Sequence, residues 1–142
     1  MLKISTALIT DIDSIYSIHV ECIKELKKSV SIGSETYLDY RKKSEVESII
    51  LEGESIIVRL NDIPVAYFLY AKKGEKKLIS KGIVVTNEGK GLGLQRLVHN
   101  LKSKKFKCSY VVSKYNDVSL KNVLLLGLKV TRSINEVDNL YE

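Results

Sequence analysis

The first third of the chain alternates between an extended pattern and helical ones. Hydrophobic and polar residues alternate weakly over Leu2–Ala7, which predicts an edge strand. Apolar residues then recur every three or four positions over Ile12–Leu26, the spacing of one helix face. Ser44 and Glu47 form a capping box that predicts the start of a second short helix, which Gly53 ends. A strand followed by two helices is therefore expected.

Three extended runs follow, and each is rich in β-branched and aromatic residues. They span Ser55–Leu60, Ile63–Ala71 and Lys76–Val85. Polar turns separate them at Asn61–Asp62 and Lys72–Glu75. Consecutive strands joined by short turns pair antiparallel, so this region predicts a meander.

The pattern returns to helical spacing over residues 91–103 and then to a short apolar strand, Phe106–Val112. Because a whole helix separates this strand from Lys76–Val85, the two strands are expected to be parallel through a right-handed crossover. A last helix is predicted over Asn116–Leu126, closed by Gly127. One or two terminal strands are expected in the ranges 128–134 and 137–141.

These elements predict an α+β fold in a single domain, residues 1–142. Its sheet is mixed and mostly antiparallel, Leu78–Val85 and Phe106–Val112 form a splayed parallel pair, and helices cover both faces. With 142 residues, 44% of them hydrophobic and one proline, the chain is long enough for one core and unlike a disordered protein.

Composition also bears on location. The longest nearly apolar run, Ile63–Ala71, has half the length needed to cross a bilayer. The two cysteines, Cys22 and Cys108, are too few for a disulfide framework and are expected to be buried thiols. We therefore expect a cytoplasmic protein without a membrane segment.

Charge is divided unevenly along the chain. The net charge is −3 over residues 1–71 and +9 over residues 72–142, which favours an anionic ligand for the second half. One alternative is a lysine-rich solubilising surface. Another is a nucleic-acid-binding module without chemistry that contacts phosphates through Lys102, Lys104, Lys105 and Lys107.

The segment Glu88–Gly93 lies between an expected strand and an expected helix and contains three alternating glycines. Glycine lets the backbone approach phosphate oxygens, and a helix N-terminus supplies free N–H groups and partial positive charge. The segment lacks the Lys-Ser/Thr pair of a P-loop and the strand context of a dinucleotide fingerprint. A glycine-rich turn needed only for chain reversal is the alternative to a phosphate site.

This loop resembles that of the GNAT superfamily of N-acetyltransferases, whose motif is Arg/Gln-x-x-Gly-x-Gly/Ala. Glu88–Gly93 matches its glycines, and Asn116–Ser119 with Gly127-Leu128 keeps the spacing of a second family motif. The resemblance implies the GNAT fold and transfer of an acetyl group from acetyl-CoA to a primary amine. It also implies roles for residues of the strand, loop and last helix: Ile83, Val84 and Val85 would pair with pantetheine, Gly89, Lys90, Gly91, Leu92, Gly93 and Leu94 would hold the pyrophosphate, and Asn116 and Ser119 would line the arm.

The sequence departs from the family at two positions. Glu88 replaces the first motif residue, Arg or Gln, and a carboxylate beside a pyrophosphate would weaken binding unless it points away. Val123 stands where the family has its general-acid tyrosine, and valine cannot donate a proton. Tyr115 is a candidate substitute or an ordinary surface or core tyrosine. A catalytically degenerate acyl-CoA-binding protein is therefore an alternative to an active enzyme.

No catalytic residue can be assigned from the sequence. A general base would have to be water or one of several scattered groups: Glu21, Glu25, Asp39, Glu54 and, on the apolar stripe of the first helix, His19. The oxyanion would be held by backbone N–H groups near Val84 and Val85. The acceptor is an amine of unknown identity, free or borne by a tRNA or a protein. No metal is expected, and a homodimer is left open.

Overall fold

The structure is a computed structural model that describes residues 1–18, 20 and 42–142, and these residues build one seven-stranded sheet. The strand order is β1-β2-β3-β4-β5-β7-β6, and each neighbouring pair is antiparallel except β4 and β5, which are parallel. This confirms the predicted mixed, mostly antiparallel sheet. The strands are β1 (Leu2–Thr6), β2 (Ile56–Leu60), β3 (Ile63–Gly74), β4 (Lys77–Val85), β5 (Lys107–Ser113), β6 (Val130–Ser133) and β7 (Asp138–Tyr141).

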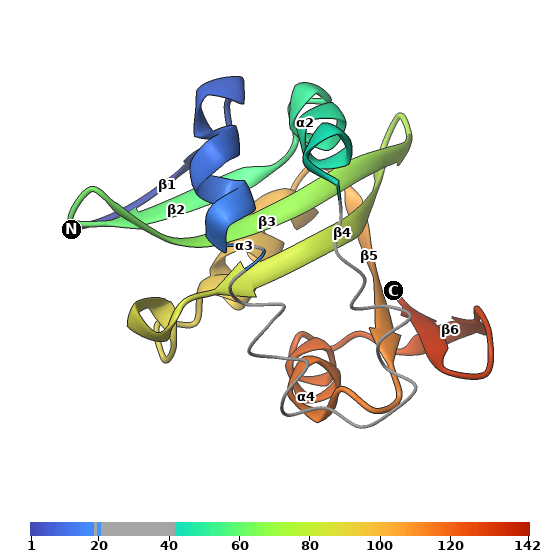
Figure 1. The fold of residues 1–142 in the computed structure, drawn as a ribbon. Helices are drawn as coiled ribbons and strands as arrows, with labels where there is room; N and C mark the ends of the chain where they lie inside the picture. Colours follow the sequence, from blue (N-terminus) through green and yellow to red (C-terminus); the bar gives the residue numbers. More distant parts are fainter. Residues whose placement is uncertain (19, 21–41) are drawn as a thin grey trace.

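Helices cover both faces of this sheet, as predicted (Figure 1). The helical elements are η1 (Ile9–Asp11), residues 12–18, α2 (Lys43–Leu51), η2 (Asn87–Gly89), α3 (Leu94–Ser103) and α4 (Asp117–Leu125). On one face, Ile15 and the buried side of α2 pack on Ile57, Tyr67 and Leu69. On the other face, side chains of α3 and α4 pack on alternate residues of β3, β4 and β5. Two cores result because successive side chains of a strand point to opposite faces.

The turns of the meander follow from their residues. Asn61 and Asp62, between β2 and β3, have φ angles of 51° and 69°. Positive φ at both central residues defines the type I′ hairpin turn, which Asn and Asp tolerate better than other side chains do. The turn after β3 is shorter than predicted, because this strand continues to Gly74.

Two predicted helix starts are wrong. Residue 91 is not helical, and α3 begins three residues later, at Leu94, with Gly93 as its N-cap. Helix α2 begins at Lys43 and is preceded by Lys42 without a capping side chain. Ser44 is already inside its first turn, so the predicted capping box does not form.

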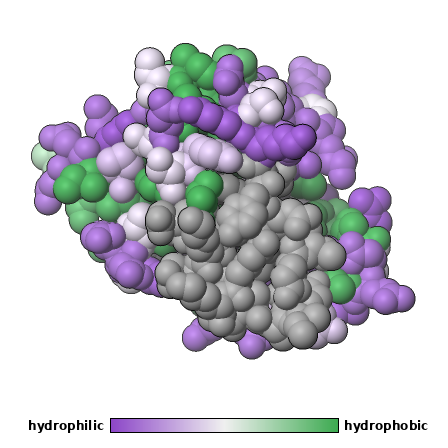
Figure 2. Space-filling model, in the orientation of Figure 1, coloured by the Kyte–Doolittle hydropathy of each residue, from purple (hydrophilic) through white to green (hydrophobic). Residues whose placement is uncertain are grey.

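The structure also bears on burial and surface character. Cys108 is a buried free thiol, as expected, whereas Cys22 lies outside the described residues. Among the helices of the described residues, none is long and apolar enough to cross a membrane. Among the residues that are coloured by hydropathy in Figure 2, hydrophilic ones predominate and hydrophobic ones gather in small separate areas.

Candidate functional site

Strands β4 and β5 separate shortly after they begin. Their pairing joins Lys77–Ile79 to Lys107–Ser109, and the described residues show no pairing between the two strands beyond this point. Figure 1 shows them diverging from there, β4 toward the loop before α3 and β5 toward α4. At ~3.3 Å per residue, the edge of β4 from Ile79 to Val85 is about 20 Å long. An extended ligand with amide groups could pair with such an edge as an added strand.

The predicted pantetheine-binding residues lie along this edge. Ile83, Val84 and Val85 pair on one side with Phe68, Tyr67 and Ala66 of β3. Ile83 and Val85 pack toward the core beneath α3, while Val84 packs toward the opposite core. The strand is therefore anchored by β3 and by both cores, and its other edge faces the opening between β4 and β5.

A bulge interrupts the pairing of β4 with β3 close to the point of separation. Gly82 lies opposite Leu69, but Ser80 lies opposite Tyr70, so β4 has one extra residue here. A bulge turns backbone groups out of the regular ladder and is common beside active sites. Sequence periodicity had predicted an unbroken strand, and Gly82 was its only signal of an irregularity.

The glycine loop follows the end of β4, at the wide end of the opening, and Gly89 fixes it to the sheet. Gly89 is buried, and its N–H donates to the Thr86 carbonyl over 3.0 Å. A Cβ at this position would lie 2.9 Å from a Val85 methyl group and 3.0 Å from the carbonyl oxygen of Val65. Gly89 is thus required by close packing of the backbone, whatever ligand the loop binds.

Gly91 and Gly93 have a different role from Gly89. Their φ angles are 84° and 65°, and no atom lies within 4 Å of the position where a Cβ would be. The first intrahelical bond of α3 runs from the Leu97 N–H to the Gly93 carbonyl over 3.1 Å. The amides of residues 94–96 therefore have no intrahelical acceptor, and no side chain caps them. Free N–H groups at a helix N-terminus can bind an anion such as a phosphate.

Charges around α3 also favour an anion at its N-terminus. No acidic residue lies in its first turn, and Arg96 lies there exposed, where the helix dipole disfavours a cation unless an anion is near. Lys90 is exposed on the preceding loop. The pKa of the exposed Glu88 carboxyl is lowered, chiefly by a hydrogen bond from its own backbone N–H. That Glu88 points away from a bound pyrophosphate stays a prediction. Arg96 was missed, although its place three residues after Gly93 was a signal.

Asn116 and Ser119 lie after β5, on the other arm of the opening. Asn116 is buried as the N-cap of α4, and its Oδ1 accepts a hydrogen bond from the Ser119 N–H over 3.2 Å. This bond explains the spacing of the two residues by helix capping alone. Contact with a cofactor arm stays a prediction.

The position of the family's general-acid tyrosine is filled by core packing. Val123 is 1% exposed and belongs to the core beneath α3 and α4. Tyr115 lies outside this core and is 45% exposed.

A buried polar chain lies beside the point of separation and was missed from the sequence. The hydroxyls of Tyr70 and Tyr110 are 2.9 Å apart, and the Tyr110 hydroxyl lies 2.8 Å from His99 Nδ1. His99 Nε2 is 3.2 Å from the Ser103 hydroxyl. Burial raises the pKa of both tyrosines and lowers the pKa of His99, so these groups are uncharged near neutral pH. Their spacing gave no signal, because the three rings come from three different elements.

The remaining candidate groups are not brought to the site. Glu54 forms ion pairs with Lys102 (3.0 Å) and Lys72 (3.9 Å), and Lys102 is in the last turn of α3, away from the glycine loop. Because Lys102 is buried in this pair, it is not available to bind nucleic-acid phosphates. The other predicted base candidates lie outside the described residues: His19, Glu21, Glu25 and Asp39.

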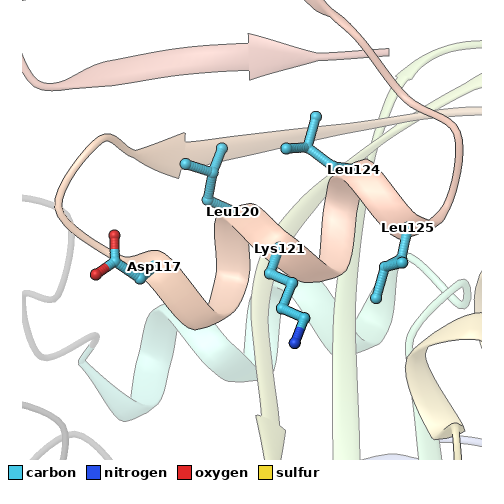
Figure 3. Close-up of a pocket in the computed structure, with 5 residues that line it drawn as sticks. All are labelled: Asp117, Leu120, Lys121, Leu124 and Leu125. Carbon is cyan, nitrogen blue, oxygen red and sulfur yellow. The ribbon is translucent and has the colours of Figure 1, made fainter.

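One further cavity, of about 360 Å³, lies along α4 and contains none of the predicted site residues (Figure 3). Its lining residues are Asp117, Leu120, Lys121, Leu124 and Leu125. In Figure 3, Leu120 and Leu124 point to one side of the helix and Lys121 and Leu125 to the other. The described residues also contain no cluster of side chains that could hold a metal ion.

No protein-family model matches the sequence, and a search of curated proteins finds no similar sequence. Solved structures do match. A GNAT-family acetyltransferase from Listeria monocytogenes has a TM-score of 0.80 at 15% identity, with 99% of this chain and 92% of that chain covered. The PaiA N-acetyltransferase of Thermoplasma acidophilum, solved with coenzyme A, has a TM-score of 0.80 at 13% identity, with 99% and 97% covered. The chain has the GNAT acetyltransferase fold.

The GNAT fold is also that of Arabidopsis thaliana Naa50, solved with a bisubstrate analogue containing CoA, which has a TM-score of 0.71 at 13% identity. The match covers 99% of this chain and 96% of that chain. The resemblance inferred from the two sequence motifs is therefore confirmed at the level of the fold.

Proposed function

We propose that residues 1–142 form a single acetyltransferase domain that binds acetyl-CoA between β4 and β5 and transfers its acetyl group to a primary amine. The observation that carries this proposal is the combination of a separated strand pair with an uncapped, glycine-lined helix N-terminus at its wide end. The fold neighbours solved with CoA or a CoA-containing analogue support the same ligand.

In this proposal each part of acetyl-CoA meets a different part of the opening. The pyrophosphate accepts hydrogen bonds from the amides of Gly91 and of residues 93–96, with Lys90 and Arg96 supplying positive charge. The pantetheine amides pair with the edge of β4 at Ile83–Val85, and the arm passes Asn116 and Ser119. The thioester then lies toward the point of separation, near the bulge at Ser80–Gly82.

The reaction is direct attack within a ternary complex. The lone pair of the neutral amine forms a bond to the acetyl carbon, the C–S bond breaks, and the CoA thiolate leaves. The nitrogen loses one proton, which the thiolate or water accepts. Backbone N–H groups of the bulge at Ser80–Gly82 are suited to hold the developing oxyanion, as are those near Val84 and Val85 that point away from β3.

Without the family's general-acid tyrosine, the CoA thiolate has to leave before it is protonated. A thiolate with a pKa near 8.5 leaves without prior protonation far more readily than an alkoxide or amide does. A domain with Val123 in its core can therefore still transfer acetyl groups. We expect a slow enzyme in which neither Tyr115 nor Val123 acts as a general acid.

An acetyl-CoA turnover assay over a panel of amines tests the proposal, with thiol release as the readout. Acetyl-CoA-dependent thiol release that requires an amine would support it. CoA binding without turnover on any amine would indicate the catalytically degenerate alternative. Absence of CoA binding by a folded protein would overturn the proposal.

A further inference from the structure

A polar groove of about 320 Å³ lies where the β3–β4 hairpin, the start of β5 and the β6–β7 ribbon meet. Its lining includes Lys73, Lys77, Lys107 and Arg132, and we call it the basic groove. On β5, its residues Lys107 and Ser109 alternate with Cys108 and Tyr110, which belong to the core beneath α3 and α4. The basic groove is therefore on the sheet face opposite these two helices.

The basic groove has more positive than negative side chains among its lining residues. Among the described residues that line it, Glu142 is the one carboxylate, and it lies 4.0 Å from Lys107 and accepts a hydrogen bond from Thr131. Lys73, Lys77 and Arg132 make no ion pair with any residue that the structure describes. Four cations facing one carboxylate repel one another unless an anion joins them.

The basic groove reaches the point where β4 and β5 separate. Ser109 lines it and is also the last residue of β5 that pairs with β4, opposite Ile79. Its buried hydroxyl bonds to the Leu78 carbonyl over 3.3 Å, which holds the two strands together at this point. An acceptor with its amine at the point of separation could extend its remaining groups into the basic groove.

We propose that the basic groove binds an anionic group of the acceptor, so that the enzyme acetylates an amine that also carries a phosphate or a carboxylate. The proposal rests on the acetyltransferase function proposed above and names its substrate class. Arg132 can bind either anion through two parallel hydrogen bonds, and the lysines add charge that does not depend on geometry.

Two matched pairs of amines test this substrate class: phosphoethanolamine against ethanolamine, and β-alanine against β-alaninamide. The triple variant Lys77→Gln/Lys107→Gln/Arg132→Gln removes three charges from the basic groove. The control Lys3→Gln/Lys104→Gln/Lys121→Gln removes three exposed lysines that do not line the groove, so both variants have the same net charge.

We expect the wild-type protein and the control to prefer the anionic member of at least one pair. In the groove variant, KM for that amine should rise about 10-fold, since each partly exposed charge pair contributes a few-fold. KM for the uncharged amine, and the dissociation constant of CoA, should change less than about two-fold. The pair that shows the preference identifies phosphate or carboxylate as the anion.

A binding measurement decides the proposal if turnover is too slow to measure. With the protein saturated with CoA, phosphoethanolamine and β-alanine are titrated by calorimetry into the wild type, the groove variant and the control. Binding lost only in the groove variant supports the proposal. Equal preference in all three proteins, no anion binding at all, or binding of a short oligonucleotide in place of both amines overturns it. Failure to bind CoA instead overturns the acetyltransferase function itself.

Discussion

Replacing Gly91 by Asp separates a phosphate-binding loop from a simple turn. Gly91 has a φ of 84° and open space around its missing Cβ, so the new side chain fits without a clash. The left-handed backbone costs about 1 kcal/mol for an aspartate, which lowers the Tm by roughly 4 °C in a domain of this size. A carboxylate about 5 Å from a phosphate, at an effective dielectric constant of 20, raises the free energy of the complex by roughly 3 kcal/mol. The dissociation constant of CoA should therefore rise about 100-fold.

Two matched variants isolate the cause, with calorimetry for CoA binding and thermal unfolding for stability. Gly91→Asn adds a side chain of nearly the same shape without charge and should weaken CoA binding only a few-fold. Gly53 also has a φ near 90° (88°) and no atom within 4 Å, but it follows α2, so Gly53→Asp should lower the Tm by a similar amount and leave CoA binding unchanged. If folded Gly91→Asp binds CoA as tightly as the wild type, the loop is not the pyrophosphate site.

Three further substitutions test the packing around the site. Gly89→Ala places a Cβ 2.9 Å from Val85 and should lower the free energy of unfolding by about 2 kcal/mol in urea titrations; an unchanged midpoint would contradict the close approach. Val123→Tyr should cost about 1–3 kcal/mol by overpacking, measured in the same way, without raising turnover; a faster enzyme would show that the family's tyrosine site is intact. Burial lowers the pKa of His99 below its ordinary 6.5 in the folded protein. The neutral imidazole therefore makes its full contribution to the free energy of unfolding above pH 6.5, and this contribution is lost as pH falls toward the folded-state pKa. The pH dependence of unfolding below 6.5 should therefore be shallower in His99→Gln, and an equally steep dependence would contradict a neutral buried imidazole.

Much of the fold could be predicted because its local signals agree with one another. The change from period two to period 3.6 after Val85, and back at Phe106, predicted the strand-helix-strand unit that contains the parallel pair. The first residues of the helices were less predictable. The start of α3 depends on the left-handed conformation of Gly93, and that of α2 on Lys42, which has no capping side chain. The periodic pattern of hydrophobic residues marks neither position.

The candidate site was only partly predictable, because several of its features depend on contacts between distant elements. The glycines predicted a loop. Only packing against Val65 distinguishes Gly89, which has no room for a Cβ, from Gly91, which has open space there. The bulge in β4 depends on register with β3, which a single strand does not reveal. The basic groove likewise joins Lys77 to Arg132, residues that are far apart in the sequence.

The most direct test of the account is a crystal structure of the protein with acetyl-CoA. The account predicts the pyrophosphate on the amides of Gly91 and of residues 93–96, and the pantetheine amides paired with β4 at Ile83–Val85. The thioester should lie within hydrogen-bonding distance of the bulge at Ser80–Gly82, with the mouth of the basic groove beside it. Acetyl-CoA bound elsewhere on a protein that retains this fold, or a space between β4 and β5 closed to it, would contradict the account.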